Sequence, residues 1–163
     1  MSKKIKYSLD TEFDDFNFLL FGISTTLDQY SVITQINNLL NIEFCLQSVV
    51  PYYLKGNSIF NYNLYTCNVP ELFLEFNLIA NLSNFETTQV ATLTNDLFAE
   101  QAVEERARLI KELPKTDYFI IVKGEQILAY ENKILEKLKQ VNDFTQIQQI
   151  QPFDLKNASH LIF

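Results

Sequence analysis

The sequence predicts an α+β protein: a single domain with a mixed β-sheet and helices packed mainly on one face. Three observations support this prediction. The length of 163 residues suits one domain, and a hydrophobic share of 47% is enough for a substantial core. Segments with the two-residue period of strands alternate with segments of helical period, in the order β-α-β-β-β-α-β-α-β. We therefore expect one domain over residues 1–163, with 1–12 and 155–163 as candidate mobile ends.

The first strand is expected in FNFLLFGIS, residues 16–24, because a near-continuous apolar run is typical of a strand buried on both faces. A helix is expected next, from Leu27 to Leu40. Thr26 and Gln29 have the spacing of a capping box at its start. Five residues then recur at helical spacing: Tyr30, Ile33, Ile36, Asn37 and Leu40.

Three strands should follow as an antiparallel meander, because the connections between them are short. The first begins near Ile42, and the second is predicted in SIFNYNLYTC. In that second strand, apolar and polar residues alternate, with Phe60, Tyr62 and Leu64 on one face. The third lies in ELFLEFNLIAN, where one face carries Leu72, Leu74, Phe76 and Leu78. We expect the other face of this third strand, with Phe73, Glu75 and Asn77, to be half exposed.

A second helix is expected over residues 97–113, capped near Thr94 or Asp96. The residues that share one face of it are Phe98, Ala102, Leu109 and Leu113. An apolar strand, TDYFIIV, should follow. A third helix then carries Ile127, Ile134, Leu138 and Val141 on one face, and a last strand lies in TQIQQIQPF. The strand–helix–strand units at both ends should form right-handed crossovers where their strands are parallel, which makes the expected sheet mixed.

The formal net charge of −7 disfavours nucleic acid as a partner, because a protein must bring Lys and Arg to the phosphates. The N-terminal residues lack the apolar segment of a secretory signal, and the densest apolar stretches are too short to span a bilayer. Cys45 and Cys67 fall in expected strands and are interpreted as buried thiols rather than a disulfide. We therefore predict a cytoplasmic protein that binds neither nucleic acid nor a membrane.

No metal and no cofactor are predicted. Four carboxylates could offer oxygen ligands to Ca²⁺ or Mg²⁺, namely Asp10, Glu12, Asp14 and Asp15. No glycine shapes a ligand loop there, so a solvated acidic segment is favoured. His160 is the only histidine, which excludes zinc sites built on two or more histidines, and it is expected to be an exposed residue of the tail. With three glycines and no phosphate-binding motif, a nucleotide cradle is disfavoured as well.

Glu112, Asp117 and Tyr118 are the candidate binding residues, and they flank the turn into the TDYFIIV strand. A Glu–Asp pair can divide acid and base roles when burial separates the pKa values of the two carboxyls. A structural interpretation competes with this one. Asp117 can accept hydrogen bonds from nearby backbone amides of a turn, and Tyr118 suits a strand. No catalytic residue is assigned.

The segment IKELPKTDY, residues 110–118, resembles the signature of the IPExxxVDY family, small bacterial proteins of unknown function. Ile110, Glu112, Asp117 and Tyr118 match, whereas the family has Pro at position 111 and Val at position 116. The stretch FGISTTLDQYSVITQINNLLNI and the final SHLIF are also similar to the family pattern. The resemblance implies a small cytoplasmic domain without an assigned activity, and it implies no catalytic residues.

Taken together, the sequence favours a non-catalytic protein that acts through association, with a second copy of itself or with another protein. Tyr and Phe on both faces of the predicted meander motivate this hypothesis, because exposed aromatic residues are common at interfaces. The alternative is a small-molecule-binding protein or an enzyme with a site near Glu112, Asp117 and Tyr118.

Overall fold

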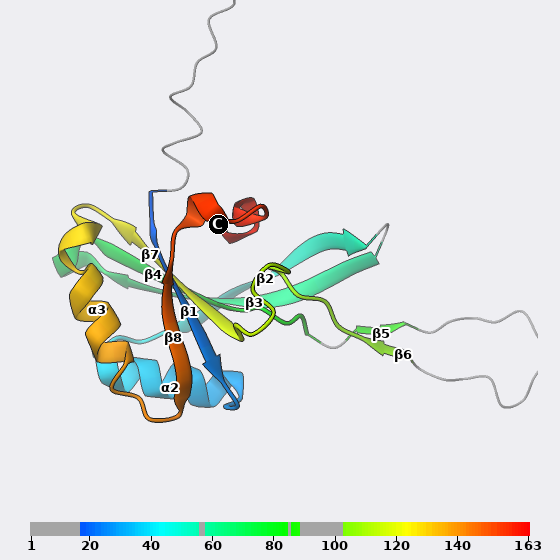
Figure 1. Cartoon of the computed structure of the whole chain (residues 1–163), viewed down its shortest axis with the longest axis horizontal. Helices are drawn as coiled ribbons and strands as arrows, with labels where there is room; N and C mark the ends of the chain where they lie inside the picture. Colours follow the sequence, from blue (N-terminus) through cyan, green and yellow to red (C-terminus); the bar gives the residue numbers. More distant parts are fainter. Residues whose placement is uncertain (1–16, 56–57, 85, 89–102) are drawn as a thin grey trace, which may run out of the picture.

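A six-stranded sheet forms the centre of the protein, with strands in the spatial order β2-β3-β4-β7-β1-β8 (Figure 1). This computed structural model describes residues 17–55, 58–84, 86–88 and 103–163. The strands of the sheet are β1 (Leu19–Thr25), β2 (Cys45–Lys55), β3 (Ser58–Val69), β4 (Leu74–Ala80), β7 (Tyr118–Gly124) and β8 (Phe144–Ile150). The helices are α2 (Gln29–Leu40) and α3 (Glu131–Leu138). A separate two-stranded pair consists of β5 (Glu86–Thr88) and β6 (Val103–Glu105).

The α+β class is confirmed, but the expectation of a mixed sheet was wrong, because all pairings in the six-stranded sheet are antiparallel. The crossover units explain the difference. β7 and β8 are joined through α3 and run in the same direction, yet β1 lies between them and pairs antiparallel with both. Likewise β1 and β2, joined through α2, run in the same direction, but three other strands lie between them in the sheet. The predicted β2–β3–β4 meander is confirmed.

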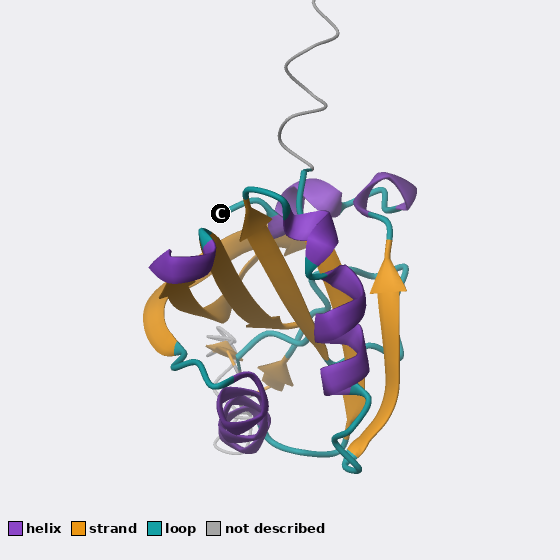
Figure 2. Cartoon of the chain, turned by 90° about the vertical axis from the view of Figure 1, so that its left-hand side faces the viewer, coloured by secondary structure: helices purple, strands orange, loops and turns teal. Residues whose placement is uncertain are grey.

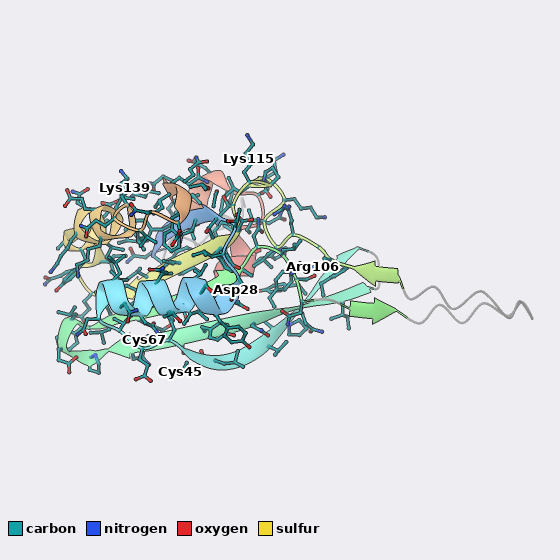
Figure 3. The ribbon with its side chains drawn as sticks, turned by 90° about the horizontal axis from the view of Figure 1, so that it is seen from below. Asp28, Cys45, Cys67, Arg106, Lys115 and Lys139 are labelled. Carbon is teal, nitrogen blue, oxygen red and sulfur yellow. The ribbon has the colours of Figure 1, made fainter. Side chains whose placement is uncertain are left out.

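Both helices pack on one face of the sheet, as predicted (Figure 2). Their buried side chains and the alternate residues of the central strands form one apolar cluster, which includes Val32, Ile36, Phe21, Phe76, Ile120, Ile134 and Leu138. The cap of α2 differs from the prediction. Asp28, rather than Thr26, is the N-cap, because its Oδ1 accepts hydrogen bonds from the backbone N–H groups of Tyr30 and Ser31 at 3.0 and 3.1 Å (Figure 3).

Within the described residues, no α-helix covers the opposite face of the sheet. A second apolar cluster joins the other alternate residues of the strands to the segment before β7 and to the C-terminal residues; its members include Phe60, Tyr62, Phe119, Ile121, Leu109, Ile110 and Leu161. Within the predicted helix over residues 97–113, positions 97–102 and its cap at Thr94 or Asp96 lie outside the described residues. The rest is strand β6 followed by turns, so the helical prediction was wrong there.

Long-range hydrogen bonds explain why residues 106–113 are not helical. The backbone N–H of Ala107 donates to the Ser83 hydroxyl at 3.0 Å, and that of Leu109 donates to the carbonyl oxygen of Asn81 at 2.7 Å. These are the donors that helical hydrogen bonds would use. Because the partners come from the segment after β4, tertiary contacts override the helical preference that the sequence predicts for this segment.

Three further residues differ from their predicted environments. Cys45 is exposed and Cys67 is half-buried, and both are free thiols. Cys45 pairs with Thr66, the neighbour of Cys67, so the two cysteines point to opposite faces of the sheet. His160, expected to be exposed, is half-buried: its ring packs 4.9 Å from that of Tyr52, and its backbone oxygen accepts a hydrogen bond from the Tyr52 hydroxyl.

Of the two candidate mobile ends, residues 1–12 lie outside the described part. Residues 155–163 include the short 3-10 helix η4 (Ala158–Leu161), whose Leu161 is fully buried in the second cluster. Within the described residues, no helix has the length and apolar character needed to cross a bilayer.

We expect the stability of the protein to decline above pH 10 in part through Tyr62. Burial raises the pKa of this fully buried phenol above 10.0, and the neighbouring Tyr52 raises it further. Unfolded Tyr62 would ionise near pH 10 while folded Tyr62 stays neutral, so this stabilisation is complete below pH 10 and is lost as the pH rises. The expected slope is about 1.4 kcal/mol per pH unit for one such group.

Urea unfolding of the wild type and of Tyr62→Phe at several pH values between 8 and about 11 measures this contribution. The variant loses the 2.8 Å hydrogen bond from the Tyr62 hydroxyl to the carbonyl oxygen of Ala107, so we expect it to be less stable at pH 8 by about 1 kcal/mol. Above pH 10 its stability should fall less steeply than that of the wild type. Equal slopes for the two proteins would contradict the assignment.

Candidate functional site

Glu112 binds the C-terminal segment of the chain. Its Oε1 accepts hydrogen bonds from the backbone N–H groups of Lys156 and Asn157 at 2.8 and 3.1 Å, and its Oε2 accepts one from Asn157 Nδ2 at 3.0 Å. Partial burial acts to raise the pKa of Glu112, but these hydrogen bonds and one from its own backbone outweigh it, so the pKa lies below its usual value. The carboxylate therefore stays charged and ties residues 156–157 to the turn before β7.

Asp117 and Tyr118 act at a different place, the end of β1 and the start of α2. Asp117 Oδ2 accepts a hydrogen bond from the backbone N–H of Thr25 at 2.8 Å. The Tyr118 hydroxyl donates to the carbonyl oxygen of Leu27 at 3.0 Å. Burial raises the pKa of Tyr118, and the charges of Asp117 and Asp28 add to the rise. The two side chains thus hold the connection between β1 and α2, whereas Glu112 holds the C-terminal segment.

Asn81 organises the segment 110–118, which resembles the IPExxxVDY signature. The sequence did not indicate a role for this residue. Asn81 is fully buried just after β4. Its side-chain Nδ2 donates to the carbonyl oxygens of Leu113 and Thr116 at 3.0 and 2.9 Å, and to that of Ile110 at 3.3 Å. Its Oδ1 accepts from the backbone N–H of Ile110 at 2.8 Å. One buried amide therefore fixes residues 110–116 as two consecutive turns.

A polar hollow of about 450 Å³ lies on the face of the sheet opposite the helices. Polar residues of β3 and β4 and the C-terminal Ile162 and Phe163 line it. Among them Asn77 is only 1% exposed, so the expectation of a half-exposed face was wrong at this residue, whereas Glu75 is half-buried as expected. The Nδ2 of Asn77 donates to Glu75 Oε1 at 2.7 Å. Neither Glu112 nor the Asp117–Tyr118 pair is among the residues that line this hollow.

The free edge of β8 is the surface that is best suited to binding another protein. β8 is the last strand of the sheet, and Figure 2 shows it along one side of the molecule with no other described element outside it. Its sequence, FTQIQQI, contains no charged residue and no proline. Soluble proteins commonly protect an edge strand with charges, prolines or bulges, because its unpaired N–H and C=O groups can bind another strand. Beyond its first two residues, β8 lacks such protection.

Two exposed apolar side chains lie beside the C-terminal half of β8. Leu128, in the 3-10 helix η2 (Ile127–Ala129), is 72% exposed, and Phe153, in η3 (Pro152–Asp154), is 60% exposed. Both line a shallow depression together with Gln149 and Ile150 of β8. The single charged residue among those that line this depression is Glu131. An uncharged strand edge and an apolar surface are therefore contiguous; we call the combination the β8 edge surface.

The other edge of the sheet, β2, is protected. Pro51 lies in its middle and has no N–H to donate. The register of β2 against β3 shifts twice, between Leu46 and Ser48 and between Tyr53 and Lys55, which is the irregularity that β-bulges introduce. β8 has one such shift, opposite Ser24 and Thr25 at its beginning. The two edges therefore differ in their capacity to extend the sheet.

The fold and this site define an α+β protein whose antiparallel sheet has one open edge. Comparisons with protein families, curated proteins and solved structures found no match for this chain. The resemblance to the IPExxxVDY family therefore stays a prediction. Among the residues that the structure describes, no group of three or more His, Cys, Asp or Glu side chains could hold a metal ion.

Proposed function

We propose that the protein is non-catalytic and acts through association with a second copy of itself, joined by antiparallel pairing of the two β8 strands. The observation that carries this proposal is the β8 edge surface: an uncharged, proline-free edge strand next to exposed Leu128 and Phe153. Two antiparallel copies of one strand form a two-fold symmetric pair, in which each copy offers the same donors and acceptors to the other.

Charge restricts where a second copy can bind. Each chain carries a formal charge of −7, which disfavours contact between two copies over most of their surfaces. β8 contributes no charge to the contact, so it is a place where two copies approach with little repulsion. The protected β2 edge has a second consequence. Because β2 is a poor pairing partner, addition through β8 ends at a dimer instead of growing into a continuous sheet.

The internal partners of Glu112, Asp117 and Tyr118 also favour this function over the alternative of a site at those residues. Each of the three makes hydrogen bonds to segments of its own chain. A reactive pair of carboxylates would need to face a common substrate, whereas Glu112 and Asp117 bind different parts of the fold. We therefore assign these residues a structural role within the proposal.

Light scattering coupled to size-exclusion chromatography of the full chain tests the proposal. We expect a mass near twice 19.0 kDa at high protein concentration and dissociation on dilution. Gln146→Lys places a positive charge on the exposed surface of β8 in both copies, within the proposed contact, and should weaken the dimer at least tenfold, or by about 1.4 kcal/mol. Leu128→Gln should weaken it as well by removing apolar contact.

Gln47→Lys is the matched control for Gln146→Lys, because it makes the same change at an exposed position of the opposite edge strand. Leu46→Gln is the control for Leu128→Gln, since Leu46 is an exposed leucine of β2, 55% accessible. Neither control should alter the mass. A monomer at a concentration of several hundred micromolar, or a dimer that the two controls disrupt and the β8 variants do not, would refute the proposal.

A further inference from the structure

An apolar cleft on the helix side of the sheet has two lysines at its mouth. The cleft lies where the C-terminal end of α2, the middle of α3 and the turn between β3 and β4 meet, and its volume is about 240 Å³. Leu40 of α2, Val69 of β3, Phe76 of β4 and Ile134 of α3 line it. Phe76 and Ile134 are 4% and 5% exposed, so the floor of the cleft is the apolar core itself.

The charge of the cleft is opposite to that of the whole chain. Its charged residues are Lys133 and Lys137, one turn apart on α3, and no acidic residue lines it. The net charge of the chain is −7. A positive, apolar cavity in an acidic protein therefore selects ligands by both sign and polarity.

The two lysines have different surroundings. Lys137 Nζ donates to the carbonyl oxygen of Leu39 at 3.3 Å, in the last turn of α2, which contains no basic residue of its own. The C-terminal end of a helix carries a partial negative charge of about half a unit, and Lys137 offsets it. Lys133 is exposed, and no described residue supplies a carboxylate or a hydrogen-bond acceptor to it. The positive charge that remains for a ligand is thus centred on Lys133.

We infer that this cleft binds a small organic carboxylate with an apolar body, such as a short-chain fatty acid. The apolar part of the ligand lies against Phe76 and Ile134, and its carboxylate lies at the mouth beside Lys133. At about 30 Å³ for each water-sized group, 240 Å³ holds roughly eight non-hydrogen atoms, the size of hexanoate. A neutral alcohol of the same length gains the apolar contacts alone. A protonated amine is repelled by the ammonium groups of the two lysines.

Titrations of the full chain with hexanoate, hexan-1-ol and hexylamine test the inference, with two-dimensional amide NMR spectra as the readout. We expect hexanoate to bind more tightly than hexan-1-ol by about threefold to fivefold, the effect of a partly exposed ion pair, and hexylamine to bind most weakly. Amide shifts should be concentrated at the residues that line the cleft. Butanoate should bind more weakly than hexanoate, because each methylene group adds apolar contact.

Lys133→Gln isolates the charge. This variant should lower the affinity for hexanoate by the same threefold to fivefold and leave the affinity for hexan-1-ol unchanged. Lys139→Gln, at an exposed lysine that follows the last residue of α3 and does not line the cleft, is the matched control and should change neither affinity (Figure 3). Because the Lys133 ammonium has no hydrogen bond to another described residue, its substitution should leave the fold intact, and the amide spectrum of the free variant verifies this.

Three results would overturn the inference: equal affinities for hexanoate and hexan-1-ol, loss of hexanoate binding in Lys139→Gln but not in Lys133→Gln, or hexanoate shifts located at the β8 edge surface instead of the cleft. Saturation only at hundreds of millimolar hexanoate would also overturn it, as the sign of non-specific contact. None of these outcomes depends on the oligomeric state, so the proposed association through β8 can succeed or fail separately.

Discussion

Asn81→Ala should lower the free energy of unfolding by about 3–5 kcal/mol, a large part of the stability of a domain of this size. The substitution removes a fully buried amide that binds four backbone groups of residues 110–116. Each buried donor or acceptor left without a partner costs about 1–3 kcal/mol. Alanine also leaves a polar-walled void between the end of β4 and the turns that precede β7.

Part of that loss is offset within the turns. The carbonyl oxygens of Ile110 and Leu113 also accept the turn hydrogen bonds from the N–H groups of Leu113 and Thr116, at 3.3 and 3.2 Å. The backbone N–H of Asn81 donates to the carbonyl oxygen of Asp117, and its carbonyl oxygen accepts from the N–H of Leu109. These two hydrogen bonds do not involve the side chain, so they remain in the variant. The expected effect is therefore smaller than the sum over four separate hydrogen bonds.

Chemical unfolding of the wild type, Asn81→Ala and Asn84→Ala measures the effect. Asn84 is the matched control, since its Nδ2 donates a single hydrogen bond of 2.9 Å to Asn63 Oδ1 and it is only partly buried. We expect Asn84→Ala to cost about 1 kcal/mol. Similar losses for the two variants would show that Asn81 does not organise residues 110–116. Asn81→Asp retains the acceptor for Ile110 but loses the amide donors and buries a charge, so it should also destabilise strongly.

Gly124→Ala should have the second-largest effect, a destabilisation of about 2–4 kcal/mol. Gly124 ends β7 with φ of 144°, a region that residues with a side chain rarely adopt. A Cβ atom there would collide with the carbonyl oxygen of Phe73 and would lie 3.0 Å from Leu74 Cδ2. Since the principal obstacle is the backbone of Phe73, the residue just before β4, a side-chain rotation cannot relieve the clash.

Gly22→Ala is the control, because Gly22 is also in a central strand but has an ordinary φ. A Cβ at Gly22 would lie 2.9 Å from Ile150 Cδ1, the end of a flexible side chain that can move, and 3.0 Å from Cγ2 of the buried Thr116. Alanine also reduces the conformational entropy of the unfolded chain. We expect a change within about 1 kcal/mol. Thermal unfolding of the two variants tests the contrast, and equal stability would contradict the backbone interpretation of Gly124.

Local periodicity predicted much of the fold because it depends on short stretches of chain. Phe60, Tyr62 and Leu64 are buried on one face of β3, as their alternation predicts. Along α3 and its flanks, Ile127, Ile134, Leu138 and Val141 are all buried. In both cases a residue and its neighbours two, three or four positions away decide which side faces the core.

The candidate site could be predicted only in part, because its parts are far apart in the sequence. The sequence pattern indicated Glu112, Asp117 and Tyr118 as candidate binding residues. It does not show that Glu112 binds residues 156–157, more than 40 positions away. Nor does it show the role of Asn81. An asparagine at the end of an apolar strand suggests an ordinary turn, and a signal would have been its position directly after a strand that becomes central.

The sequence by itself determined most of the strands and helices of the described chain and which side of most of them is buried, with residues 86–88 and 103–113 as exceptions. The tertiary structure decided which strands are neighbours, placing β1 between β7 and β8 and leaving β8 as an open edge. The physical reason is that pairing along a sheet is made by backbone N–H and C=O groups, which every residue except proline has alike. Side-chain periodicity therefore reports burial, whereas strand order and edges depend on how the whole chain packs.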